Sequence, residues 1–122
     1  MISDSFQFTL KTFENTLSKH HFTLDVKHNF QYGYIIEYIS YNKRLAFTFD
    51  YKENTLYYYL IYGLTTTYPN DLDISKVVLF ERLYSKFIPN VDLSTYQPRN
   101  GNYEEAINAI AKFINTFGSE FL

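Results

Sequence analysis

Three consecutive strand-like runs joined by very short turns constrain the fold of this chain most. They cover residues 32–41, 44–50 and 55–62. Strands joined by two- to five-residue loops pair antiparallel with their neighbours. Asn42–Lys43 suits a two-residue turn because Asn tolerates a positive φ, and residues 51–54 form a four-residue loop. The pattern therefore predicts an antiparallel meander.

The two turns also predict how the three strands align. The first places Tyr38 opposite Phe47 and Glu37 opposite Thr48, and the second places Phe47 opposite Tyr58. Both turns bring the same apolar set to one face, which predicts the core face of the sheet. That set is Leu45, Phe47, Phe49, Leu56, Tyr58 and Leu60. A slip of one residue at either turn would send these side chains to the other face.

The residues before the meander predict one helix and one more strand. The helix has an apolar stripe at +4, +3, +4 spacing, made of Phe6, Leu10, Phe13 and Leu17. Ser3 suits its N-cap position. In the strand, three apolar residues alternate with polar ones, and these are Phe22, Leu24 and Val26.

Helical spacing returns after the meander, at residues 74–87. Asp71 or Asp73 suits the cap of this helix, and Pro89 ends it, because the residue before a proline avoids the helical region. Residues 88–101 contain two prolines and show no periodicity, so they form a long connection.

The last predicted helix has clear end signals. Asn102 followed by Glu105 resembles a capping box, and Gly118 suits the position just beyond the C-terminus. A length of 122 residues is typical of one domain, so residues 1–122 are predicted to form a single unit. We therefore predict an α+β fold: a four-stranded antiparallel meander with helices packed on one face, in the order α-β-β-β-β-α-α.

The residue types that support catalysis or metal binding are sparse. The absence of cysteine excludes disulfides, thiol nucleophiles and thiolate metal sites. His20 and His21 are adjacent and His28 lies at the far end of the predicted strand, which is not the spacing of a metal site. With four glycines there is no glycine-rich phosphate loop. We expect a protein that is not an enzyme and has no metal or cofactor.

Charge and hydropathy limit the classes of partner. The chain has 11 basic and 13 acidic residues, and the basic ones are scattered rather than gathered as in nucleic-acid-binding proteins. It opens without a signal-peptide pattern, and no apolar run approaches the roughly 20 residues that span a bilayer. We expect a cytoplasmic protein whose partner is neither a nucleic acid nor a membrane.

The second face of the predicted sheet carries the candidate binding site. Its aromatic, aliphatic and charged side chains are typical of a protein-interaction surface when they are contiguous and exposed. The candidate partner-binding residues are Glu37, Ile39, Tyr41, Arg44, Tyr57 and Tyr59. Glu37 is interpreted as solvated or partner-facing rather than as a buried base. Alternatively, residues 88–101 or the C-terminal tail cover this face and complete the core.

The stretch YGYIIEYISYNKRLAFTFDYKENTLYYYLIYG, with one helix before it and two after it, resembles small bacterial immunity proteins of polymorphic or contact-dependent toxin systems. The shared features are the leading helix, a Y-x-S-x-x-x hairpin crossing from Tyr38 to Lys43, and an aromatic-rich strand. The resemblance implies a non-catalytic protein that binds and neutralises a cognate toxin. Two other classes stay open: a homodimeric secretion chaperone that binds a client segment, and a small-ligand-binding domain with an aromatic cavity. The sequence leaves monomer and homodimer undecided.

Overall fold

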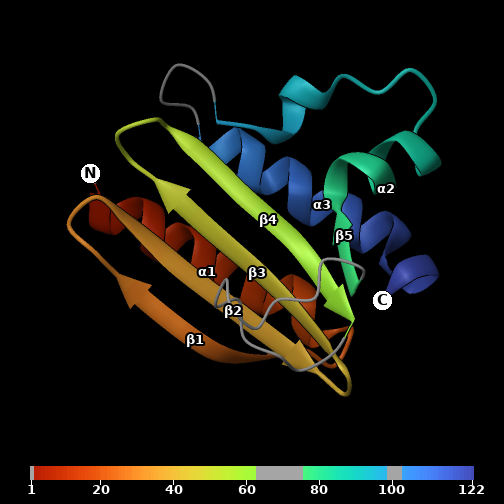
Figure 1. The fold of residues 1–122 in the computed structure, drawn as a ribbon, viewed down its shortest axis with the longest axis horizontal. Helices are drawn as coiled ribbons and strands as arrows, with labels where there is room; N and C mark the ends of the chain where they lie inside the picture. The colour runs from red at the N-terminus through yellow and green to blue at the C-terminus, as the bar shows by residue number, and fades with distance from the viewer. Residues whose placement is uncertain (1, 63–75, 99–102) are drawn as a thin grey trace.

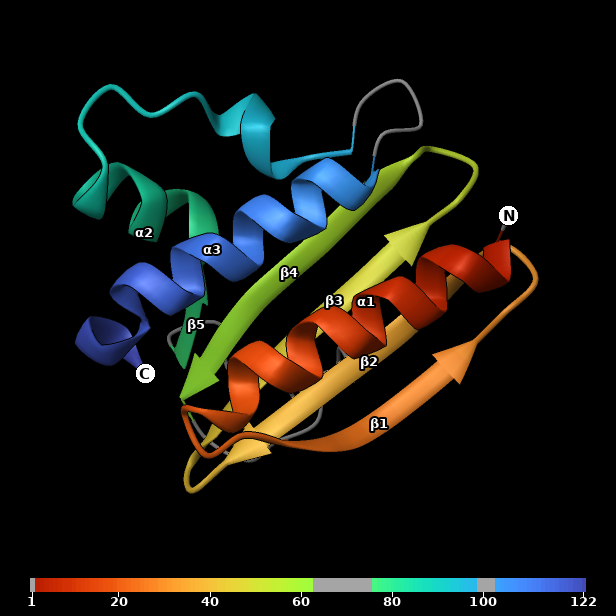
Figure 2. The same ribbon diagram turned by 180° about the vertical axis from the view of Figure 1, so that it is seen from behind.

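The computed structural model describes residues 2–62, 76–98 and 103–122, which form an antiparallel sheet with helices on one side (Figures 1 and 2). The strands lie in sequence order: β1 (Thr23–Asn29), β2 (Gly33–Ser40), β3 (Lys43–Asp50), β4 (Thr55–Tyr62) and β5 (Val77–Leu79). The helices are α1 (Ile2–Ser18), α2 (Phe80–Phe87) and α3 (Tyr103–Phe121), and a short 3₁₀ helix, η2, spans Leu93–Tyr96. The predicted α+β class and antiparallel sheet are confirmed, but the described residues form five strands instead of four.

The fifth strand falls within the segment predicted as a helix. Residues Val77–Leu79 pair antiparallel with the edge of β4, and α2 begins only at Phe80. Two adjacent valines favour a strand, and pairing gives the β4 backbone a partner along its free edge. The predicted caps Asp71 and Asp73 lie outside the described residues, and Leu79 occupies the cap position without a side-chain hydrogen bond.

The predicted register of the β3–β4 hairpin is confirmed. Phe47 lies opposite Tyr58, and Asp50 lies opposite Thr55. The Asp50 carboxylate accepts hydrogen bonds from the next backbone N–H groups, at 2.8 Å from Lys52 N and at 3.3 Å from Glu53 N. These bonds close the four-residue loop as an Asx-type turn.

The β2–β3 hairpin differs from the prediction by two residues. Ser40 lies opposite Lys43, so the turn is Tyr41–Asn42 instead of Asn42–Lys43. Because the shift is even, every side chain stays on the predicted face but acquires new cross-strand neighbours. Phe47 consequently lies opposite Ile36 rather than Tyr38.

A β-bulge changes the alternation within β1. Leu24 lies opposite Tyr38, but Val26 lies opposite the adjacent Glu37, so one extra residue is inserted between them. The predicted alternation holds as far as Leu24 and is then inverted. Lys27, opposite Ile36, comes to the helix side of the sheet.

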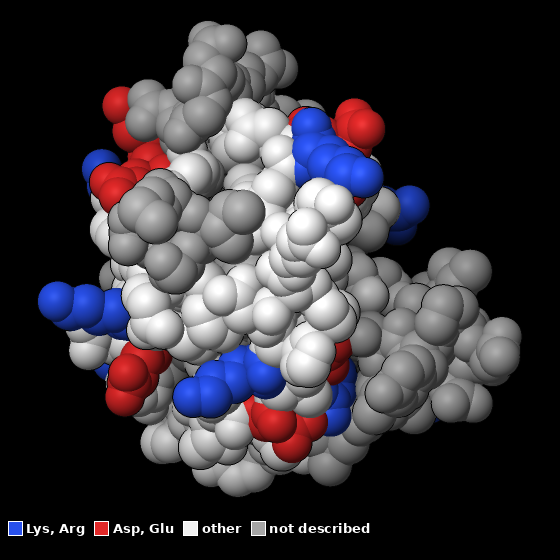
Figure 3. All heavy atoms as spheres, turned by 90° about the vertical axis from the view of Figure 1, so that its left-hand side faces the viewer, with Lys and Arg blue, Asp and Glu red and all other residues white. Residues whose placement is uncertain are grey.

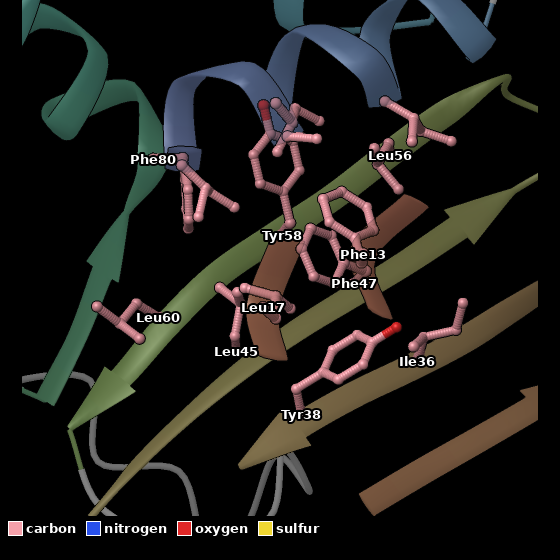
Figure 4. Packing of buried hydrophobic residues seen from close by; sticks show 14 of the residues in the cluster. Phe13, Leu17, Ile36, Tyr38, Leu45, Phe47, Leu56, Tyr58, Leu60 and Phe80 are labelled. Carbon is pink, nitrogen blue, oxygen red and sulfur yellow. The ribbon is translucent and has the colours of Figure 1, made fainter. Parts of the chain in front are cut away.

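The core lies between the sheet and the helices α1 and α3 (Figure 4). Phe47 is at its centre, with its ring stacked 4.3 Å from Phe13 of α1 and 5.8 Å from Tyr58. A second group of rings joins α2 to α3, where Tyr84 lies 4.6 Å from Phe113. The predicted core face of the sheet is therefore confirmed.

The connection after α2 packs on the helix side of the sheet. Tyr96 of η2 stacks on Tyr84 at 3.8 Å, and α3 forms part of the helix layer up to Phe121. The described part of this connection and the C-terminal tail therefore do not cover the second sheet face. The alternative prediction, in which one of these two segments covers that face and completes the core, is wrong for both described segments. Gly118 lies inside α3 instead of beyond it, where a Cβ atom would be 2.8 Å from the His20 ring. The predicted cap Asn102 lies outside the described residues.

We expect Tyr58→Phe to lower the free energy of unfolding by about 1–3 kcal/mol, because it leaves buried polar groups without a partner. The Tyr58 hydroxyl donates to the Tyr96 carbonyl at 3.0 Å and lies 2.8 Å from the Tyr84 hydroxyl, which is therefore the donor to Tyr58. Urea denaturation measures the effect. Tyr57→Phe in the same strand is the matched control, since Tyr57 is exposed. Equal stability of the two variants would show that the hydroxyl network contributes nothing.

Candidate functional site

The sheet face opposite α1 and α3 carries the six candidate residues, but the structure does not bring them together as one exposed patch. They divide by exposure into a buried pair, two half-buried side chains and two exposed tyrosines. These are Glu37 and Arg44, then Ile39 and Tyr59, and finally Tyr41 and Tyr57.

Glu37 and Arg44 form a buried ion pair. Arg44 Nη1 lies 2.7 Å from Glu37 Oε1, and Arg44 Nη2 lies 2.8 Å from Asp25 Oδ2 of the β1 bulge. Glu37 and Arg44 are each only 4% exposed, so the interpretation of Glu37 as solvated is wrong. The three charges connect β1, β2 and β3, which assigns them a structural role in strand alignment.

The observed register explains why the sequence did not reveal this pair. Arg44 lies opposite Ile39 and Glu37 lies opposite Ala46, so the two charges are diagonal neighbours across one pair of strands. With the predicted turn, Glu37 would lie opposite Thr48, too far along the strand for contact. The sequence feature that could have indicated this ion pair was the presence of two opposite charges on one predicted face of a single hairpin.

The two exposed tyrosines lie toward opposite ends of the sheet. Tyr41 is 81% exposed in the β2–β3 turn, with a φ of 51°. Tyr57 is 57% exposed and lies in the row Ile35–Thr48–Tyr57 near the other end. At about 3.3 Å per residue along β2, roughly 20 Å separate the two positions. The predicted grouping of Tyr41 with Tyr57 is therefore wrong.

Further exposed aromatic residues lie at the same end of the sheet as Tyr57, and the sequence analysis did not select them. The β1–β2 turn exposes Phe30 and Tyr32, which together with Ile35 and Thr48 border a shallow hollow of about 340 Å³. We call the residues at this end the hairpin-end patch, which consists of the exposed Phe30, Tyr32 and Tyr57 and the half-buried Ile35. Figure 3 views this end of the molecule and shows an uncharged centre with charged side chains around its margin. The sequence feature that could have indicated this patch was the presence of two aromatic residues within a short turn.

The backbone beneath the patch is well connected. Phe30 N donates to Gly33 O at 2.7 Å across the β1–β2 turn, and Tyr51 N donates to Tyr32 O at 2.8 Å, which joins the two hairpin ends. Gly33 permits a close approach of strands, because a Cβ atom there would overlap the backbone oxygen of Phe49. The patch is therefore built on a backbone that is held in place before any partner binds.

Side-chain contacts orient the aromatic rings as well. The Phe30 ring lies edge to face with His28 at 4.2 Å, and Lys52 Nζ lies 4.3 Å from the centre of the Tyr32 ring. Each contact leaves the aromatic side chain exposed. The patch thus combines apolar area with a nearby cation.

The described residues hold neither a metal-binding cluster nor a membrane-spanning helix. Within them, no three His, Cys, Asp or Glu side chains gather closely enough to hold a metal ion. Across residues 2–62, 76–98 and 103–122, no helix combines the length and apolar character needed to cross a membrane. The chain matches no protein-family model, and no curated protein or solved structure is significantly similar to it.

Proposed function

We propose that this protein is a non-catalytic protein-binding module, an immunity protein that acts in the cytoplasm by binding and neutralising a cognate bacterial toxin. The observation that carries the proposal is the hairpin-end patch, with three exposed aromatic rings at one end of the sheet. Aromatic residues dominate the energetics of protein interfaces, where tyrosine contributes a large contact area at low entropic cost.

The construction of the patch supports binding of a folded partner. One hydrogen bond across the β1–β2 turn and one between the two hairpin turns hold the aromatic side chains on a defined backbone. A surface that is already ordered loses little conformational freedom on association, so more of the contact energy becomes affinity. The layout resemblance to immunity proteins indicates a toxin as the partner.

We expect Tyr32→Ala and Tyr57→Ala each to weaken the complex with the toxin encoded beside this gene by about 30-fold, which corresponds to about 2 kcal/mol. Calorimetric titration measures the affinity, and survival of toxin-producing cells measures protection. Tyr41→Ala is the matched control because Tyr41 is an exposed tyrosine outside the patch. The affinity of this variant for the toxin is expected to stay within about threefold of that of the original protein, which is a change in binding free energy of less than about 1 kcal/mol.

Two results would contradict the proposal. One is full protection and affinity in both patch variants while they still unfold cooperatively. The other is a stable homodimer in light scattering instead of a 14.6 kDa monomer, which would favour the secretion-chaperone alternative.

A further inference from the structure

A groove of about 500 Å³ runs between α1 and the edge strand β1, on the opposite side of the sheet from Tyr57. In Figure 2, α1 lies over β2 and β3 while β1 extends beyond it. Side chains from α1 form one wall, side chains from β1 form the other, and Tyr38 of β2 lies at the base. The lining residues include Leu10, Lys11, Glu14, Leu24, Lys27 and Tyr38.

The Tyr38 hydroxyl is the unusual group in this groove. The residue is only 3% exposed, and within the described part of the chain its hydroxyl has no hydrogen-bond partner. A buried hydroxyl without a partner is costly and is rare in folded proteins. In Figure 4 its oxygen points away from Leu17 and Leu45 of the core. Burial, and next the Glu14 carboxylate, raise the pKa of this hydroxyl above its ordinary value, so it stays protonated and can donate.

The charges around the groove favour an anion. Lys11 comes from α1 and Lys27 from β1, and neither forms an ion pair with another described residue. Glu14 is the one carboxylate among the described lining residues, so the lining carries one excess positive charge. Lys27 reaches this side only because of the β1 bulge, since regular alternation would turn it to the other face.

We propose that this groove binds a small amphipathic carboxylate. Its apolar body contacts Leu10 and Leu24, its carboxylate lies between Lys11 and Lys27, and one oxygen accepts a hydrogen bond from Tyr38. The volume is in the range of small-molecule sites, which combine apolar walls with a few polar groups. Because the hydroxyl has almost no accessible surface, the ligand must displace the long, exposed side chain of Glu14. The site does not depend on the hairpin-end patch or on the proposed function.

The test uses the full chain and decanoate as the probe, with decylammonium as its counterpart of opposite charge. We expect decanoate to shift backbone amide signals of α1 and β1 in NMR spectra, and decylammonium to bind at least about tenfold more weakly, a difference of about 1.4 kcal/mol. A decanoate Kd above about 1 mM, or shifts confined to the hairpin end, would overturn the site. Equal binding of the two probes would overturn the carboxylate assignment.

Two variants test the individual contacts. Lys27→Glu is expected to abolish the preference for decanoate, whereas Lys86→Glu, at an exposed lysine of α2 outside the groove, should leave it unchanged. Tyr38→Phe should weaken decanoate binding about tenfold while the melting temperature stays the same or rises, because the hydroxyl that is removed has no partner among the described residues. Undiminished binding in Lys27→Glu or Tyr38→Phe would overturn the assigned contact.

Discussion

Replacing Phe47 with alanine is expected to lower the free energy of unfolding by about 3–5 kcal/mol, the range found for buried aromatic residues. Phe47 is 1% exposed and its ring contacts both Phe13 of α1 and Tyr58 of β4. Its removal therefore opens a cavity where the sheet meets the helix layer. Equilibrium urea denaturation, followed by far-ultraviolet circular dichroism, measures the change.

The control for this prediction is a phenylalanine at the surface. Phe30 is exposed in the β1–β2 turn, so Phe30→Ala is expected to cost less than about 1 kcal/mol. A loss below about 1 kcal/mol for Phe47→Ala as well would mean that the two sheet faces are exchanged.

The second large effect is expected on the other sheet face, at Arg44. Arg44→Ala leaves the Glu37 carboxylate buried without the cation 2.7 Å away, and breaking a buried ion pair in this way costs about 3–5 kcal/mol. Asp25→Asn is expected to cost less than about 1 kcal/mol, because the Asp25 side chain is 37% exposed to water. The same urea denaturation measures both variants.

A double variant separates the charge effect from loss of packing. Glu37→Leu combined with Arg44→Met removes both charges while keeping apolar volume, and it should recover most of the stability lost in Arg44→Ala. A double variant that is no more stable than Arg44→Ala would show that the arginine stem, rather than the uncompensated carboxylate, dominates.

The two predictions concern the two kinds of information that specify this sheet. The face on which Phe47 lies follows from its place in an alternating strand, since side chains on a strand point to opposite faces in turn. The contact between Arg44 and Glu37 depends in addition on which residues lie opposite each other. Alternation is unchanged by a shift of two residues, so it cannot decide between Asn42–Lys43 and Tyr41–Asn42 as the turn.

Long-range pairing accounts for the other differences. Residues Val77–Leu79 have helical spacing when read with the segment that follows, but they extend along the free edge of β4, which is distant in sequence. The β1 bulge likewise has no local sequence signal. It positions Asp25 beside Arg44 and brings Lys27 to the groove beneath α1.

The candidate binding site was therefore only partly predictable. Tyr57 was correctly expected on the second face, where it is exposed. The association of Tyr57 with Phe30 and Tyr32 depends on the β1–β2 turn and the β3–β4 turn reaching the same end of the sheet. No spacing within the sequence measures that proximity.

The sequence by itself determined the α+β class, the core face of the central strands and the β3–β4 register, because these follow from periodicity and from the length of one loop. Only the tertiary structure decided the fifth strand, the two-residue shift beside Tyr41 and the buried Glu37–Arg44 pair. It also decided that the Tyr38 hydroxyl has no hydrogen-bond partner among the described residues. The physical reason is that local patterns determine which way a side chain points. Its neighbours depend on pairing and packing between segments far apart in the chain.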